Sequence, residues 1–226
     1  MPGKRTYADS CGVARALDVV GERWALLVVR ELLLGPKRFT DLRAGLPTLG
    51  PDVLAQRLRD LEAAGVLARR TLPPPAGSRV YELTAWGRGL EPAILALAHW
   101  GDAAPGPAAP DAPRGADSAV LGLRAAFDPA AAGGWRATYA LHLGADVFHV
   151  RIADGRMALA RGAPPERPDV IIETSPDTLT ALLRHETGLG DARRAGTLRF
   201  AGDKALVKRL LRGQGRSTLL VADHRT

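Results

Sequence analysis

Apolar positions recur at helical spacing in the first part of the chain and alternate at strand spacing in much of the second. The predicted elements of the first part are helices at residues 13–20, 24–34, 40–44, 51–64 and 84–100 and strands at residues 66–72 and 79–83. This order, in which a short helix, a turn and a longer helix precede a hairpin, predicts a winged helix-turn-helix. That motif places its second helix in the major groove of duplex DNA.

The helix at residues 51–64 separates its apolar and polar residues. Gly50 suits the N-cap, and Pro51 suits the first position, where a missing N–H is no loss. Leu54, Leu58 and Leu61 form a stripe that we expect to pack inward. The other faces carry glutamine and arginine, which pair bidentately with adenine and guanine edges. An ordinary amphipathic helix with a solvated face would show the same pattern, and the arginine-flanked hairpin that follows favours DNA binding.

DNA contacts are predicted on this helix, on the hairpin and at the start of the shorter helix. Gln56, Arg57 and Arg59 would read or position bases, while cations beside the hairpin tip would hold phosphates. The predicted DNA-binding residues are Lys37, Arg38, Asp52, Val53, Gln56, Arg57, Arg59, Arg69, Arg70 and Arg79.

Positive charge is concentrated on the same unit. The chain has a net charge of +7, and residues 36–79 hold eight basic and four acidic side chains. Such local excess is the electrostatic footprint of nucleic-acid binding. A basic, arginine-rich and alanine-rich composition also reflects a GC-rich genome, so the total charge alone decides little.

Other function classes leave no pattern in the chain. The single cysteine, Cys11, excludes an internal disulfide and a cysteine-rich zinc site, and the five histidines show no metal-ligand spacing. We find no nucleophile–base pair, glycine-rich phosphate loop or dinucleotide fingerprint, so we predict no catalytic residues, cofactor or metal. No apolar run approaches membrane-spanning length and no signal peptide is evident, so we expect a soluble cytoplasmic protein with no membrane partner.

A change of composition divides the chain. Residues 102–115 contain four prolines and no aromatic or large aliphatic residue, which is typical of a solvated linker. We therefore predict two domains, residues 1–101 and 118–226, joined by a linker at residues 102–117.

The second domain is predicted to be α+β, with an antiparallel sheet and segregated helices. Residues 135–143 and 148–152 alternate as strands do, and Asp154-Gly155 is a type I′ hairpin signal. Further strands are predicted around residues 170–174 and 198–200, and helices at 118–127, after Ser175 and at 203–211.

The final helix of the first domain carries an apolar stripe of Leu90, Ile94, Leu97 and Trp100. Either the stripe caps the domain's own core or it pairs with a second copy. We favour a homodimer interface, because a DNA-binding dimer needs contacts outside its reading head.

Several motifs of the first domain occur together: residues 16–24 (ALDVVGERW), 38–42 (RFTDL), 53–58 (VLAQRL), 61–65 (LEAAG) and 81–84 (YELT). In this combination, residues 7–101 resemble the HxlR family of winged-helix transcription regulators. The resemblance implies a homodimer on a palindromic operator. One departure is Asp52, where the family often has a basic residue. Asp52 would repel phosphate, so this contact is altered or accepts from a cytosine amine.

Motifs in the second domain are residues 147–150 (VFHV), 154–156 (DGR), 168–179 and 196–203. With them, most of residues 118–212 resemble the sterol-carrier-protein-like fold, which commonly encloses an apolar tunnel. The resemblance implies ligand-binding candidates Trp135, Tyr139, Leu141, Phe148, Val150, Met157, Leu182 and Phe200. The alternative is that these side chains fill an ordinary core, because a fold does not confer a function.

Cys11 also has two interpretations. In part of the HxlR family an N-terminal cysteine senses oxidants or electrophiles, and Arg15 one turn away would favour its thiolate. Otherwise Cys11 is a small buried residue at a dimer interface.

The sequence thus predicts a dimeric DNA-binding regulator, a repressor, controlled by a small apolar effector in the second domain. Two alternatives remain: redox control through Cys11, and a lipid-carrier or enzyme-like second domain that the winged helix tethers to DNA.

Overall fold

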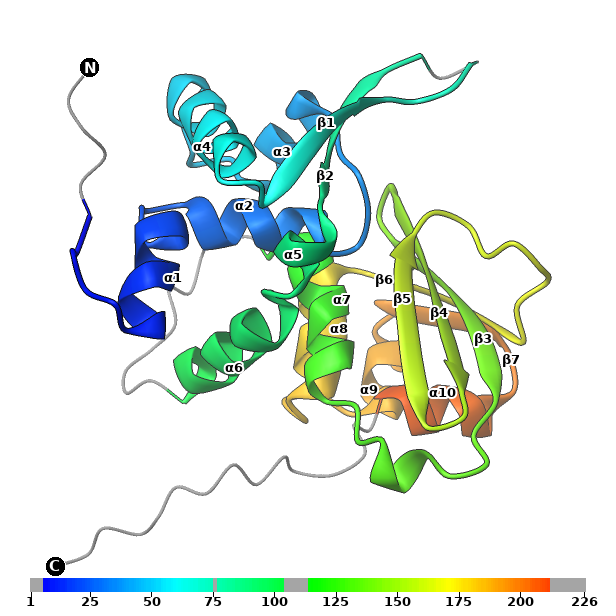
Figure 1. Ribbon diagram of the computed structural model, residues 1–226. Coiled ribbons are helices and arrows are strands. Elements are labelled where there is room, and N and C mark those ends of the chain that lie inside the picture. The colour runs from blue at the N-terminus through cyan, green and yellow to red at the C-terminus, as the bar shows by residue number, and fades with distance from the viewer. Residues whose placement is uncertain (1–5, 75–76, 104–113, 212–226) are drawn as a thin grey trace, which may run out of the picture. The chain divides into compact units, whose positions relative to one another are not determined.

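The computed structural model describes residues 6–74, 77–103 and 114–211. It divides into two compact units, Met1–Pro107 and Ala108–Thr226 (Figure 1). Most of the predicted linker, residues 104–113, and the hairpin tip at residues 75–76 lie outside the described residues.

The first unit is a winged helix-turn-helix, as predicted. Its elements are α1 (Gly12–Val20), α2 (Ala25–Leu32), α3 (Phe39–Gly45), α4 (Pro51–Ala63), β1 (Leu67–Thr71), β2 (Arg79–Leu83), α5 (Ala85–Arg88) and α6 (Glu91–Asp102). Strands β1 and β2 pair antiparallel and form the wing. Helices α3 and α4 lie beside the base of the wing (Figure 1).

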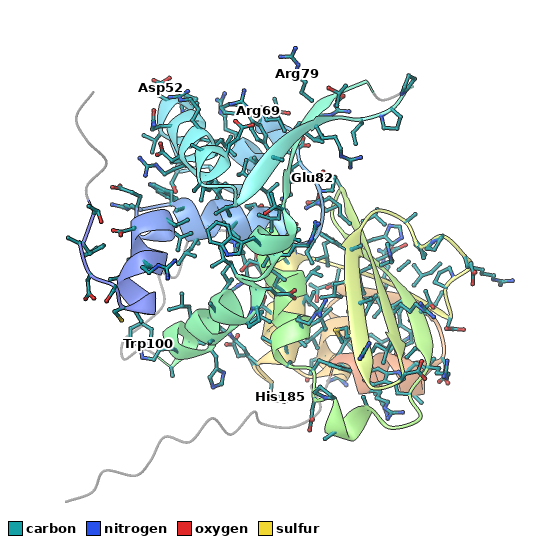
Figure 2. The ribbon with its side chains drawn as sticks, viewed as in Figure 1. Asp52, Arg69, Arg79, Glu82, Trp100 and His185 are labelled. Atoms are coloured by element: carbon teal, nitrogen blue, oxygen red, sulfur yellow. The ribbon has the colours of Figure 1, made fainter. Side chains whose placement is uncertain are left out.

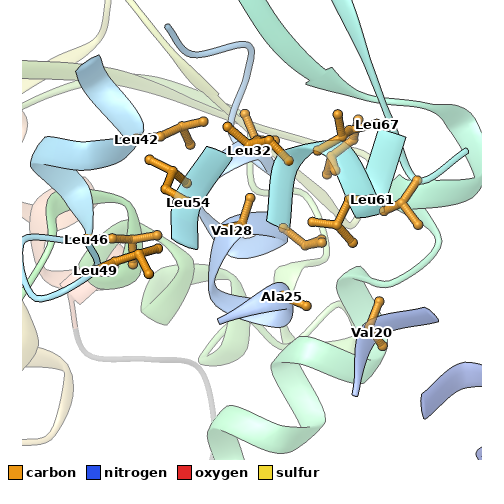
Figure 3. Close-up of a cluster of buried hydrophobic side chains, with 14 of the residues drawn as sticks. Val20, Ala25, Val28, Leu32, Leu42, Leu46, Leu49, Leu54, Leu61 and Leu67 are labelled. Carbon is orange, nitrogen blue, oxygen red and sulfur yellow. The ribbon is translucent and has the colours of Figure 1, made fainter. Parts of the chain in front are cut away.

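The core of this unit lies between α2 and α4. Val28 and Leu32 of α2 are buried together with Leu54, Leu58 and Leu61 of α4, which confirms the predicted inward stripe (Figure 3). Burial of each such side chain contributes about 1.5–3 kcal/mol relative to exposure. Because α4 is fixed along this stripe, its opposite face is held outward.

The predicted single helix at residues 84–100 is wrong, because the structure has two helices there. Thr84 caps α5, its hydroxyl accepting a bond from the Gly87 N–H, and α5 ends at Arg88. Pro92 explains the break, since it has no N–H for the Arg88 carbonyl and its ring would clash there. It is instead accommodated in the first turn of α6.

The second unit joins a five-stranded sheet to a set of helices. In chain order its elements are α7 (Ala116–Ala125), the 3₁₀ turn η1 (Ala130–Ala132), β3 (Ala137–Leu143), β4 (Asp146–Ala153), β5 (Arg156–Arg161), β6 (Val170–Thr174), α8 (Pro176–Leu183), α9 (Leu189–Arg194), β7 (Leu198–Gly202) and α10 (Lys204–Leu211). The strand order is β5-β4-β3-β6-β7. Contacts of α7 with β5 and α8, and of α10 with α8 and β6, place these helices in one layer against the sheet (Figure 1).

The sheet is mixed, which corrects the prediction of an antiparallel one. Strand β6 pairs parallel with β3, while the other pairings are antiparallel. Residues 162–169 carry the chain from β5 at one edge to the far side of β3, and a parallel pairing requires such a crossover. The predicted hairpin is confirmed: Asp154 and Gly155, with φ of 53° and 70°, form the tight turn between β4 and β5.

Candidate nucleic-acid interface

The exposed face of α4 carries the side chains predicted to read bases. Gly50 takes the extended N-cap conformation and Pro51 begins the helix. Asp52, Val53 and Gln56 lie on the side away from the leucine stripe and are exposed. Asp52 marks the outer end of α4 in Figure 2.

Hydrogen bonds already join the polar side chains of α4 to one another. Arg59 Nη2 donates to Gln56 Oε1 at 2.6 Å, and Gln56 Nε2 donates to Asp60 Oδ1 at 2.7 Å. Arg57 lies 3.3 Å from carboxylate oxygens of both Glu22 and Asp60, and its side chain is 15% exposed. Arg59 therefore lies on the open face, whereas Arg57 points to the side and its charge is neutralised within the chain.

The wing presents cations of two kinds. Arg69 pairs with Glu62 of α4 at 2.9 Å, and Arg70 pairs with Glu82 of the neighbouring strand at 3.1 Å. Arg79 is exposed, and the structure shows no ion-pair partner for it among the described residues. Figure 2 shows the Arg79 side chain extending away from the wing.

Helix α3 adds two exposed arginines. Arg38 precedes it, and the Arg38 N–H donates to the Asp41 carboxylate at 3.0 Å, which closes the first turn. Arg43 is exposed in the last turn. Sequence reasoning counted Arg43 in the local charge but did not nominate it as a contact. The exposure of Arg43 could have been predicted from the sequence, because it directly follows Leu42. The residue next to a buried position of an amphipathic helix usually faces solvent.

Lys37 differs from the other predicted contacts. Its side chain is 4% exposed, and its Nζ lies 2.6 Å from Oε2 of Glu31, which is 1% exposed. A buried, paired ammonium cannot reach a phosphate without breaking that pair. Lys37 therefore does not belong to the exposed cationic surface, contrary to the sequence-based expectation.

The eight ligand-binding candidates of the second unit converge in its core. Tyr139 and Phe148 are fully buried on neighbouring strands, and Trp135 Nε1 donates to the Tyr139 hydroxyl at 3.1 Å. That hydroxyl donates to the Leu206 carbonyl, at 3.4 Å. Burial raises the pKa of Tyr139 to about 12, so the phenol stays neutral. Leu141, Val150, Met157 and Leu182 are also buried, and Phe200 is half-buried.

Arginines cover the edges of this aromatic cluster. The guanidinium of Arg161 lies 4.6 Å from the ring centre of Phe148, and that of Arg209 lies 4.6 Å from Trp135. Arg161 also pairs with Asp117 and Asp146. The rim of the aromatic cluster is therefore charged.

A hollow of about 460 Å³ opens instead among α8, α9 and α10. Leu182, Leu189 and Leu211 supply its apolar lining, and charged or hydrogen-bonding groups come from His185, Lys208, Glu186 and Asp191. Of the eight predicted candidates, Leu182 alone lines it. Helix α9, which forms one wall, was not predicted from the sequence.

Comparison with known proteins matches each unit to a family. Residues 19–107 match the HxlR-like helix-turn-helix family, and residues 122–212 match the SCP-2 sterol transfer family. YvaP, an uncharacterised HTH-type transcriptional regulator of Bacillus subtilis strain 168, is 37% identical over 86 residues, which are 38% of this chain and 80% of YvaP. The chain belongs to the HxlR-like helix-turn-helix family.

Other proteins are similar to a comparable share of the chain. The HTH-type transcriptional regulator Rv3095 of Mycobacterium tuberculosis H37Rv is 42% identical over 90 residues, which are 40% of this chain and 56% of that protein. A solved structure of the redox regulator HypR in its oxidised form is 34% identical, covers 43% of this chain and 100% of its own, and has a TM-score of 0.38. The residue ranges of the two family matches place the HxlR-like part in the first unit and the sterol-carrier-like part in the second.

The stripe predicted as the dimer interface is divided in the structure of this HxlR-like unit. Leu90 is half-buried and Ile94 is 8% exposed within the unit's own core. Leu97 and Trp100, further along α6, are 50% and 75% exposed. Figure 2 marks Trp100 on this helix. The first half of the stripe therefore caps the unit's own core, and the second half is open to a partner.

Cys11, the residue predicted as a redox site, is exposed and forms the N-cap of α1. The backbone N–H groups of Val13 and Ala14, at the start of α1, lower the pKa of the Cys11 thiol below its ordinary value. The physical cause is the start of the helix and not Arg15, which the sequence had suggested. No helix among the described residues is long and apolar enough to cross a membrane.

Proposed function

We propose that the protein is a sequence-specific transcriptional repressor that binds a palindromic operator in duplex DNA as a homodimer. The observation that carries the proposal is the exposed polar face of α4, bordered by exposed arginines on α3 and on the wing. Membership of the HxlR-like family, whose similar members are HTH-type transcriptional regulators, supports it. A dimer that covers its operator excludes other proteins from it, which is the simplest form of repression.

In the proposed complex α4 lies in the major groove. Asp52, Val53, Gln56 and Arg59 face base edges, because the leucine stripe holds their side of the helix outward. Asp52 is an acceptor for a cytosine amine, and Gln56 and Arg59 exchange their mutual hydrogen bond for bonds to bases.

Phosphate contacts come from the wing and from α3. Arg79, Arg38 and Arg43 are exposed and available without rearrangement. Arg69 and Arg70 first leave Glu62 and Glu82, and this exchange costs little because exposed ion pairs contribute only about 0–1 kcal/mol. Binding is therefore expected to weaken steeply with salt, since each bound cation releases a counterion from the DNA.

The DNA proposal is tested with a duplex selected by the full chain from a pool of random sequences. Fluorescence anisotropy at several salt concentrations gives the affinity and its salt dependence. Arg79→Ala should weaken binding about tenfold and reduce the salt slope by about one for each phosphate that the variant no longer binds. The matched control is Arg88→Ala, an exposed arginine on α5 outside the proposed interface, which should change neither quantity. If the wild type selects no sequence, the proposal is wrong.

We further propose that a small apolar or aromatic molecule controls DNA binding from the hollow among α8, α9 and α10. His185 supports this location. It follows the C-cap of α8 with a φ of 59°, and the Glu186 N–H donates to the Ala181 carbonyl at 2.9 Å. Glycine normally occupies this position of a helix terminus, so a histidine there is strained. The His185 side chain lines the hollow together with Lys208 and three leucines. In this position its imidazole is suited to bind the polar end of an amphipathic ligand.

The aromatic anion 1-anilinonaphthalene-8-sulfonate is a suitable probe of the hollow. The full chain should bind it at a saturable site that Leu189→Glu removes, because Leu189 lines the hollow. Ile171→Glu is the control, since it also places an acid on an exposed apolar position of the same unit but outside the hollow. A probe affinity equal in both variants and the wild type would contradict the location. If the ligand lowers DNA affinity, DNA must lower ligand affinity by the same factor.

Redox control through Cys11 is the second candidate, and the lowered pKa of its exposed thiol favours it. A thiolate is the reactive form toward oxidants and electrophiles. If oxidant alone releases the wild type from its operator and Cys11→Ser abolishes that release, Cys11 is the sensor. If Cys11→Ser remains inducible by a small molecule, control lies in the second unit.

A further inference from the structure

A buried ion pair lies behind the proposed DNA-binding surface. Glu31 of α2 places Oε2 at 2.6 Å from Lys37 Nζ and Oε1 at 2.8 Å from Arg30 Nη2. Glu31 and Lys37 are almost completely buried, whereas Arg30 is partly exposed. Taking two charges out of water costs several kcal/mol per ion, which their attraction only roughly offsets. The pair is therefore expected to add little to the stability of the fold. Its geometry instead indicates a role in positioning neighbouring elements.

The main chain of Lys37 is fastened to the wing. Its N–H donates to the Tyr81 carbonyl at 3.0 Å, and the Tyr81 N–H donates back to the Lys37 carbonyl at 2.8 Å. Tyr81 is the central residue of β2. The segment before α3 thus forms a short bridge to the wing, and the side chain of the same residue anchors that segment to α2.

The end of α3 is fitted against the same carboxylate. A Cβ atom at Gly45 would overlap Glu31 Oε2, so glycine is required if the carboxylate is to keep its position. Helix α3, the wing and α2 therefore meet at one buried group.

The link reaches the DNA-facing surface through Tyr81. The Arg69 guanidinium lies 5.5 Å from the centre of the Tyr81 ring, a cation–π distance. When Arg69 exchanges Glu62 for a phosphate, this ring still supports its guanidinium. The position of Lys37 thus sets where the wing and one of its phosphate-binding arginines stand relative to α3.

We infer that Glu31 and Lys37 are positioning residues for DNA recognition, which fix the wing relative to the helix-turn-helix through the main-chain bridge to Tyr81. This inference rests on the proposed DNA-binding function. Under this inference Lys37 is not a phosphate contact. Its ammonium group pairs with Glu31 and does not contact DNA. Loss of the pair displaces the wing without removing a cation from the interface.

The test replaces both charges by apolar side chains of similar length, Glu31→Leu with Lys37→Met, in the full chain. Such replacement commonly leaves stability unchanged or higher, because neither charge is left buried alone. Below its unfolding temperature, the double variant should bind the selected duplex about tenfold more weakly than the wild type. The slope of log affinity against log salt should stay at the wild-type value. Arg79→Ala, measured alongside, should reduce that slope.

The single variant Lys37→Met extends the test if the double variant does not fold, because Glu31 keeps Arg30 as its partner. This variant should also bind the duplex about tenfold more weakly than the wild type, with an unchanged salt slope. Unchanged DNA affinity in a folded variant would show that the pair is merely structural and would overturn the inference. A salt slope reduced as in Arg79→Ala would also overturn it, because Lys37 would then contact phosphate. A wild type that selects no duplex would instead overturn the proposed function.

Discussion

The two units hold their candidate sites in opposite places. In the HxlR-like unit the predicted DNA contacts on α4 and the wing lie mainly at the surface, and the leucines that hold α4 lie beneath them. In the sterol-carrier-like unit most of the predicted ligand contacts are part of the core, with Tyr139 and Phe148 fully buried. A charged site differs in composition from the core that supports it. An apolar site is made of the same residues as a core, so composition and periodicity do not separate the two.

Each unit contains one exception to this contrast between a surface site and a core site. Lys37, a cation of the first unit, is buried because its ammonium group pairs with the buried carboxylate of Glu31. The hollow of the second unit lies where polar and apolar side chains mix, among α8, α9 and α10. Ligand-binding sites usually place a few polar groups within a mostly apolar lining.

The largest effect is expected in the core of the second unit. Phe148→Ala should lower the free energy of unfolding by about 3–5 kcal/mol, because it leaves a cavity among packed side chains. Denaturant unfolding followed by circular dichroism measures the change. Ile171→Ala, at a more exposed position of the same sheet, should cost far less. A decrease below about 1 kcal/mol at Phe148 would show that its ring borders open space and would break the comparison.

The next effect separates the two halves of the α6 stripe. Ile94→Asp places a charge in the first unit's own core and should unfold that unit, at a cost of several kcal/mol. Leu97→Asp places the same charge at a half-exposed position and should leave the unit folded while weakening the proposed homodimer. Analytical ultracentrifugation and circular dichroism together distinguish these results. A wild type that is monomeric at micromolar concentration would remove the basis for the expected effect of Leu97→Asp.

The smallest effect concerns Cys11, whose thiol pKa is lowered by hydrogen bonds from the first turn of α1. The rate of alkylation by iodoacetamide against pH should show a midpoint below that of an ordinary thiol, since the thiolate is the nucleophile. Val13→Pro removes one of the N–H donors at a position where a helix tolerates proline. Its midpoint should move toward the ordinary value, and an unchanged midpoint would assign the shift to another cause. Stability gained from the thiolate would be present above the ordinary thiol pKa and lost as the pH falls through the lowered one.

The sequence by itself determined the order of elements from α1 to β2, the inward stripe of α4 and the place of most cations. These features follow from local periodicity and from capping residues such as Gly50 and Pro51. In the second unit, Ser175 marked the start of α8 in the same way. The type I′ turn at Asp154-Gly155 was also readable, because few residues adopt positive φ easily. Pro92 was a readable signal for the break before α6, although the apolar stripe through residues 84–100 favoured one helix.

Only the tertiary structure decided which charges are available and which apolar side chains enclose space. Arg57 is neutralised by Glu22 and Lys37 is buried by Glu31, and both pairs join different elements that fold together. The parallel pairing of β6 with β3 likewise depends on a crossover between segments distant in sequence. The physical reason is common to all three: periodicity records which face of an element is buried, whereas the partner that it meets there is set by the packing of the whole unit.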